Sequence, residues 1–198
     1  MKKKAQENGA KTEQYWGGPE VDFSQIAGAY DKAHISLDLV KQYNMDILKH
    51  IITVANLTSG AYGLFDPQKS RNMVVFTEEP DPQQMMEGME SLQEAPGKKQ
   101  GFAIDVNVQR IITESQQKAA AEGEADLWEI YAVAEIASTI IHEAVHTVET
   151  EQTGTTSEGG PEGAERDFIN WFKNNLQSIV EQYPEIKPEV SDDVFQAV

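Results

Sequence analysis

The sequence predicts an α+β fold that is mostly helical, with a small sheet. Long segments carry apolar residues at three- and four-residue steps, as amphipathic helices do, and two short runs are rich in β-branched residues. With 198 residues, 39% hydrophobic and 25% charged, the chain can bury the core of one domain. We expect that domain to span 21–183, between a flexible N-terminal tail over 1–20 and an acidic C-terminal tail over 184–198.

The first predicted helix runs from Asp22 to about Leu57. Its apolar residues recur with helical spacing and would form one buried stripe: Leu37, Val40, Ile47, Leu48, Ile51 and Val54. Gly60, Gly63 and Asp66-Pro67 then break the helix.

Two strands are predicted next. The first is the run 73–77, and the second is 101–108, where apolar residues alternate with smaller or polar ones. The segment 78–97 between them is rich in turn-forming residues.

The remainder of the domain is predicted to be three helices. A helix from Gln109 to about Ala121 ends at Gly123, and a long helix runs from Asp126 to about Glu151. After a loop over 152–160, Pro161 suits the first turn of a final helix that reaches about Gln182.

The charge of the chain argues against nucleic acid or a membrane surface as its partner. Lys and Arg total 16 against 33 Asp and Glu, a formal charge of −17, which repels phosphate groups and anionic lipid. No cysteine is present, no apolar stretch is long enough to span a bilayer, and no apolar segment follows the basic first residues. These features predict a cytoplasmic location.

One motif carries chemistry. His142 and His146 lie four residues apart on the long helix, so both imidazoles face the same side, one turn apart, and can bind one ion. Glu143 is rotated by about 100° from His142, a position from which it can act as a general base on a water molecule. The neighbouring residues are uncharged, which predicts a buried helix whose histidines need partners: Thr139, Ile140, Ile141, Ala144, Val145, Thr147 and Val148.

The motif resembles that of the zincin metallopeptidases, over roughly residues 126–180. The resemblance implies a zincin-like fold, in which a small sheet packs on a long active-site helix and a second helix supplies another metal ligand. It also implies one Zn²⁺ per chain, held by His142 and His146, with Glu143 as the catalytic base. The metzincin branch is excluded because position 152 is Gln and no methionine follows Met89.

The resemblance to the compact gluzincin branch, which includes thermolysin-like enzymes, implies a third ligand from the next helix. The acidic candidates are Glu158, Glu162, Glu165 and Asp167. An antiparallel helix that starts near Pro161 reaches the height of His146 about five residues later, which favours Glu165. Glu162, one turn earlier, is the alternative third ligand, and Glu158 falls in the loop.

Other roles stay open at the level of sequence. Glu149, Glu135 and Asp167 are candidates for orienting a ligand histidine. Tyr183 and Tyr131 are candidate donors to the oxyanion, a role we leave unassigned. The resemblance further implies a sheet edge that pairs with extended substrate, for which we expect 101–108.

The sequence therefore predicts a zinc-dependent metallopeptidase that hydrolyses peptide bonds in a peptide or protein substrate. The alternatives are a catalytically inactive binding protein with the zincin fold, and an acidic interaction protein in which the histidine motif is accidental. Substrate specificity and oligomeric state are not predicted.

Overall fold

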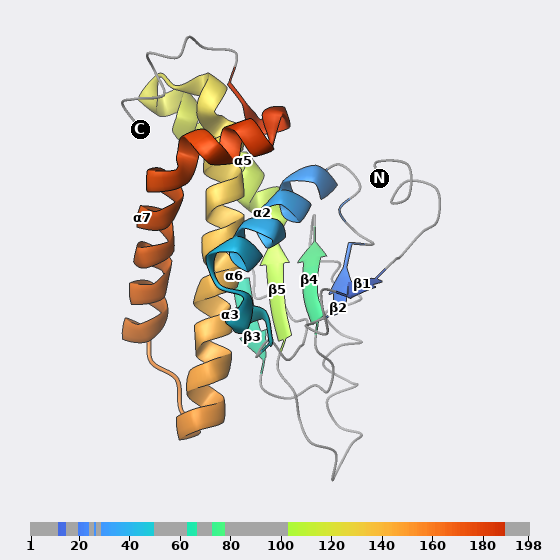
Figure 1. Ribbon diagram of the computed structural model, residues 1–198, viewed down its shortest axis with the longest axis vertical. Helices are drawn as coiled ribbons and strands as arrows, with labels where there is room; N and C mark the ends of the chain where they lie inside the picture. The colour runs from blue at the N-terminus through green and yellow to red at the C-terminus, as the bar shows by residue number, and fades with distance from the viewer. Residues whose placement is uncertain are drawn as a thin grey trace.

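The computed structural model describes residues 12–14, 20–23, 26, 29–49, 63–66, 73–77 and 103–188. Most of these residues lie in helices, so the predicted helical character is confirmed (Figure 1). The α-helices are α2 (Tyr30–Tyr43), α3 (Met45–Lys49), α5 (Val108–Glu122), α6 (Trp128–Thr153) and α7 (Gly159–Gln182). Two short 3-10 helices, η1 (Ala125–Leu127) and η2 (Pro184–Ile186), flank the last two.

The strands form a five-stranded sheet in the order β1-β2-β4-β5-β3. Their bounds are β1 (Thr12–Gln14), β2 (Glu20–Asp22), β3 (Gly63–Asp66), β4 (Met73–Thr77) and β5 (Ala103–Asn107). Strands β2, β4 and β5 are parallel, whereas β1 and β3 pair antiparallel to β2 and β5. Among the described strands, β3 therefore lies at the edge of the sheet beside β5, with Gly63 opposite Val106.

Local backbone chemistry accounts for the start of α5 and for the ends of α5 and α6. The side chain of Asn107 accepts a hydrogen bond from the Arg110 backbone N–H (3.1 Å) and caps α5. Gly123 ends α5 with φ 77°, and Gly154 ends α6 with φ 74°. This left-handed conformation favours glycine, which explains why α5 and α6 end close to their predicted bounds.

The N-terminal half differs more from the prediction. The single helix predicted from Asp22 to Leu57 is seen as α2 and α3, separated by Asn44, and α2 begins only at Tyr30. Strand β1 and the first residue of β2 lie inside the segment predicted to be a flexible tail. The turn-rich segment 78–97 and the later part of the apolar stripe, Ile51 and Val54, lie outside the described residues.

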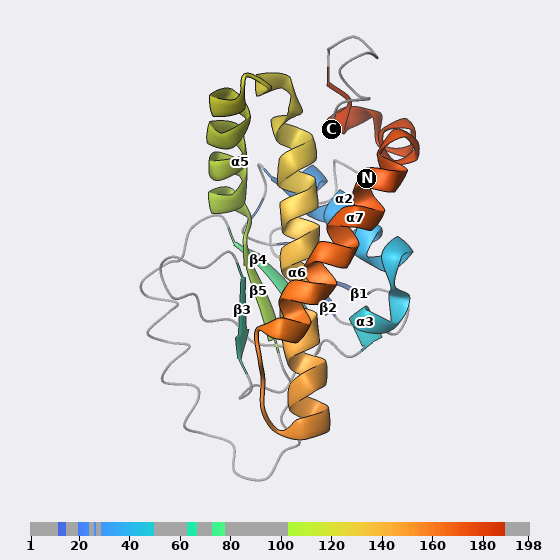
Figure 2. The same ribbon diagram turned by 90° about the vertical axis from the view of Figure 1, so that its left-hand side faces the viewer.

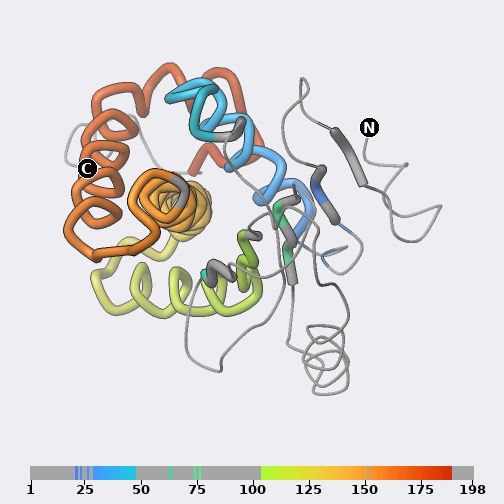
Figure 3. Tube along the Cα trace, turned by 90° about the horizontal axis from the view of Figure 1, so that it is seen from below, coloured from blue at the N-terminus to red at the C-terminus, as the bar shows by residue number. Residues whose placement is uncertain are grey.

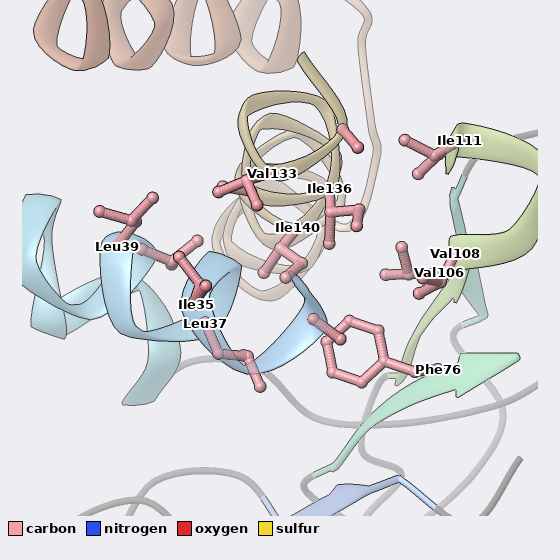
Figure 4. Close-up of a cluster of buried hydrophobic side chains, with 14 of the residues drawn as sticks. Ile35, Leu37, Leu39, Phe76, Val106, Val108, Ile111, Val133, Ile136 and Ile140 are labelled. Carbon is pink, nitrogen blue, oxygen red and sulfur yellow. The ribbon is translucent and has the colours of Figure 1, made fainter. Parts of the chain in front are cut away.

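Helix α6 lies at the centre of the helical layer. It packs against α2, α5 and α7 and also against β3 and β5 (Figures 1 and 3). Its apolar residues are buried around most of its circumference, as expected of a helix enclosed by others: Ile130, Val133, Ile136, Ala137, Ile140, Ile141 and Ala144. Figure 4 shows Val133, Ile136 and Ile140 meeting side chains of α2, β4, β5 and α5. This rigid packing holds the histidine motif in place.

Among the described residues, no helix combines the length and the apolar character needed to cross a membrane.

Candidate metal centre

His142 and His146 lie on the same side of α6, as the four-residue spacing predicts. Their ring centroids are 4.9 Å apart and the ring planes meet at 75°. His146 is buried and His142 is half-buried. Burial, with a smaller contribution from His142, lowers the pKa of His146, while Glu158 and Glu149 oppose the shift. A lowered pKa favours the neutral imidazole, which is the form that binds a metal ion.

The carboxylate that faces both histidines belongs to Glu158, the residue before α7. Its Oε2 lies 3.4 Å from Nε2 of His142 and 3.7 Å from Nε2 of His146. One ligand atom from each of the three residues lies within 4.8 Å of the other two. Two atoms that both bind a tetrahedral zinc at about 2.0–2.1 Å are about 3.3 Å apart, so small side-chain movements suffice. His142, His146 and Glu158 could therefore hold a metal ion.

Glu165, the preferred third ligand in the sequence prediction, lies on the other side of His142. Its Oε2 is 3.2 Å from Nδ1 of His142, which places it behind the imidazole. The alternative, Glu162, is exposed and lies outside the group that could hold an ion. The height argument placed Glu165 level with His146, whereas its carboxylate meets His142, one helical turn earlier in α6.

Glu149 determines where the loop between α6 and α7 runs. Its Oε2 accepts hydrogen bonds from the backbone N–H (3.0 Å) and the hydroxyl (3.3 Å) of Ser157. Residue 160 is a glycine, and a Cβ atom at this position would overlap Oε1 of Glu149. The turn is thereby held against α6, and Glu158 follows directly after Ser157. Sequence reasoning considered Glu149 only as a partner for a histidine, because the loop conformation was not predicted.

Glu143 points toward the sheet edge formed by β3. A Cβ atom at Gly63 would lie 2.8 Å from Cγ and 3.0 Å from Oε1 of Glu143, and 2.6 Å from Cγ2 of Thr139. Only a residue without a side chain allows this close approach of strand and helix. The adjacent edge is therefore β3, whereas the predicted edge, 101–108, contains the interior strand β5; that prediction was wrong.

The environment of Glu143 changes its acidity. Burial raises its pKa to about 7; His142 lowers it and Glu158 raises it, both by smaller amounts. A carboxyl group with a pKa near neutral pH is suited to both accepting and releasing a proton.

The pKa of Glu143 predicts a pH-dependent stability in the metal-free protein. The unfolded carboxyl group titrates near 4.5 and the folded one near 7. Between these values the folded state retains a proton that the unfolded state has lost, so the free energy of unfolding falls as pH rises, by up to about 3 kcal/mol. We expect Glu143→Gln to be more stable than the wild type at pH 8 but not at pH 4, in chemical denaturation with EDTA. If the free energies of unfolding of Glu143→Gln and the wild type differed by the same amount at pH 8 and pH 4, the raised pKa of Glu143 would be contradicted.

Gly63→Ala tests the contact between β3 and Glu143. The added Cβ must displace Glu143, Thr139 or the strand, so we expect a loss of about 1–3 kcal/mol in the free energy of unfolding. The matched control is Gly163→Ala within α7, where the nearest heavy atom to a new Cβ is 3.9 Å away. This control should be about 0.5–1 kcal/mol more stable than the wild type. If Gly63→Ala and Gly163→Ala had the same free energy of unfolding, β3 would not be packed tightly against Glu143 and Thr139.

Other predicted site residues lie elsewhere. The Tyr183 hydroxyl accepts a hydrogen bond from Nε2 of Gln42 (3.0 Å) beyond the far end of α7, and Tyr131 bonds to Glu124. Neither is brought to the histidines, because about eleven residues of α6 separate Tyr131 from His142 and most of α7 separates Tyr183 from Glu158. No residue is assigned as the oxyanion donor.

Comparison with known proteins found no matching family model, curated protein or solved structure. The interpretation of the site therefore depends on its own residues and their geometry.

Proposed function

We propose that this protein is a zinc-dependent metallopeptidase of the zincin type. The observation that carries the proposal is the convergence of His142, His146 and Glu158, with Glu143 beside them on the same helix. Two imidazoles and one carboxylate are a common ligand set for catalytic zinc and leave a coordination position for water or substrate.

Each residue has a distinct role in the proposed reaction. His142 and His146 bind the metal through Nε2, and Glu158 provides the carboxylate ligand in place of Glu165. Glu165 accepts a hydrogen bond from Nδ1 of His142, which orients the ring and selects the tautomer that presents Nε2 to the ion. Glu149 is a positioning residue, because it holds the loop that carries Glu158.

Zinc, when bound, supplies an acidified water and polarises the scissile carbonyl group. Glu143 accepts the proton that the attacking water loses and later donates it to the nitrogen of the leaving amine. Its pKa of about 7 allows both transfers near neutral pH. Beside Glu143, β3 is the outermost of the described strands, and an extended peptide would pair with the sheet along it.

The proposal is tested by metal content and peptide hydrolysis together. We expect the purified chain to contain about one zinc per molecule and to cleave a mixed peptide library, and we expect EDTA to stop cleavage and added zinc to restore it. Zinc binding without any cleavage would support the inactive binding protein instead. Absence of zinc binding would reject both readings and favour the acidic interaction protein.

A further inference from the structure

A cavity lies between α5, α6 and α7, away from the histidine motif. Its volume is about 580 Å³, within the range of small-molecule sites. Figure 2 shows α6 between α5 and α7, and residues of all three helices line the cavity. None of the proposed metal ligands lines this cavity.

One part of the cavity wall is apolar. It is formed by two residues of α6 and three of α7: Ile130, Ala134, Ile169, Phe172 and Leu176. Ile130, Phe172 and Leu176 also belong to the buried core, so this wall is held by tight packing. It can accept the apolar body of a ligand.

The other part of the wall is mainly acidic. Four carboxylates line the cavity against two ammonium groups, and most of these charges already have partners in the protein. Glu114 pairs with Arg110 (2.7 Å), Glu124 accepts the Tyr131 hydroxyl hydrogen bond, and the Lys118 ammonium lies 5.3 Å from the centre of the Tyr131 ring.

Glu135 is the exception. Its side chain is half-buried on α6, and within the described part of the chain no hydrogen bond or ion pair reaches its carboxylate. Burial is the largest cause that raises its pKa, followed by repulsion from Glu165, while Lys118 opposes the shift and Glu114 adds to it. A positive group placed beside Glu135 would relieve this repulsion.

We propose that the cavity binds a small organic cation, with its ammonium group against Glu135 and its apolar body against Ile169, Phe172 and Leu176. The charge of the lining excludes an anion of the same shape, and the apolar wall disfavours a purely hydrophilic cation. The site is independent of the proposed peptidase activity, since it uses none of the groups assigned to metal or proton transfer.

The test compares two probes of similar size and opposite charge, tryptamine and indole-3-propionate. Binding to the full-length chain is measured by calorimetry in EDTA at pH 8, so that metal plays no part. We expect tryptamine to bind at least about tenfold more tightly than indole-3-propionate, as a charge-assisted hydrogen bond supports. NMR of the isoleucine and leucine methyl groups should show shifts at Ile130, Ile169 and Leu176.

Three variants complete the experiment. Glu135→Gln should weaken tryptamine binding by at least about tenfold. Asp126→Asn, which removes the same charge from an exposed position outside the cavity, should leave the affinity unchanged. Phe172→Leu, which keeps an apolar wall of smaller area, should weaken tryptamine binding less than Glu135→Gln does. Circular dichroism verifies that all three variants fold. The proposal is overturned if tryptamine does not bind, if both probes bind equally, if Glu135→Gln matches the wild type, or if the shifted methyl groups lie elsewhere.

Discussion

A Glu143→Gln variant is expected to lose about a hundredfold to ten-thousandfold of its peptide hydrolysis, the usual contribution of general acid–base catalysis. Glutamine has nearly the same size and keeps the contact with β3, but it cannot accept the proton of the attacking water. The loss should appear in kcat rather than in KM, because the substituted group acts in the chemical step.

Zinc binding should be preserved in the Glu143 variant. Glu143 lies outside the three residues that could hold an ion, so the zinc affinity of Glu143→Gln should match that of the wild type in a competition assay with a chelating dye. The matched control is Glu185→Gln, an exposed acid in η2 far along the chain from the motif, which should retain full activity. If Glu143→Gln cleaves at the wild-type rate, Glu143 is not the base.

Replacing Glu158 by glutamine is expected to weaken zinc binding by more than about a hundredfold, the upper limit typical of groups that only orient a ligand. The amide oxygen is a poorer ligand than a carboxylate, and the negative charge that offsets the ion is lost. Glu165→Gln should weaken binding by only about tenfold to a hundredfold, because Glu165 acts through Nδ1 of His142.

The two carboxylates can be separated by a spectrum as well as by affinity. With cobalt in place of zinc, Glu158→Gln should change the visible absorption bands, since a ligand atom has been replaced, whereas Glu165→Gln should leave their pattern intact. Glu162→Gln serves as the control, because Glu162 is exposed and lies in the first turn of α7, between Glu158 and Glu165. A larger spectral change in Glu165→Gln than in Glu158→Gln would instead support the ligand favoured by the sequence.

The helices that carry the site were predictable because their signals are local. Glycines 123 and 154 end α5 and α6 in left-handed conformations, and the spacing of His142 and His146 is enough to place both rings on one side of a helix. The two predicted strands, 73–77 and 101–108, are confirmed as β4 and β5, whereas β1, β2 and β3 were not predicted. β3 contains a glycine that was interpreted as a helix breaker, and its four residues are stabilised by pairing with β5, which is distant in sequence.

What the sequence determined by itself was the type of chemistry and the helix that carries it: two imidazoles, an adjacent carboxylate and an apolar helix that must be buried. Which carboxylate meets which histidine nitrogen was decided by the tertiary structure alone. That choice depends on the loop between α6 and α7, which Glu149 holds through Ser157. Helical periodicity is a property of consecutive residues, whereas the path of a loop depends on hydrogen bonds between residues that only folding brings together.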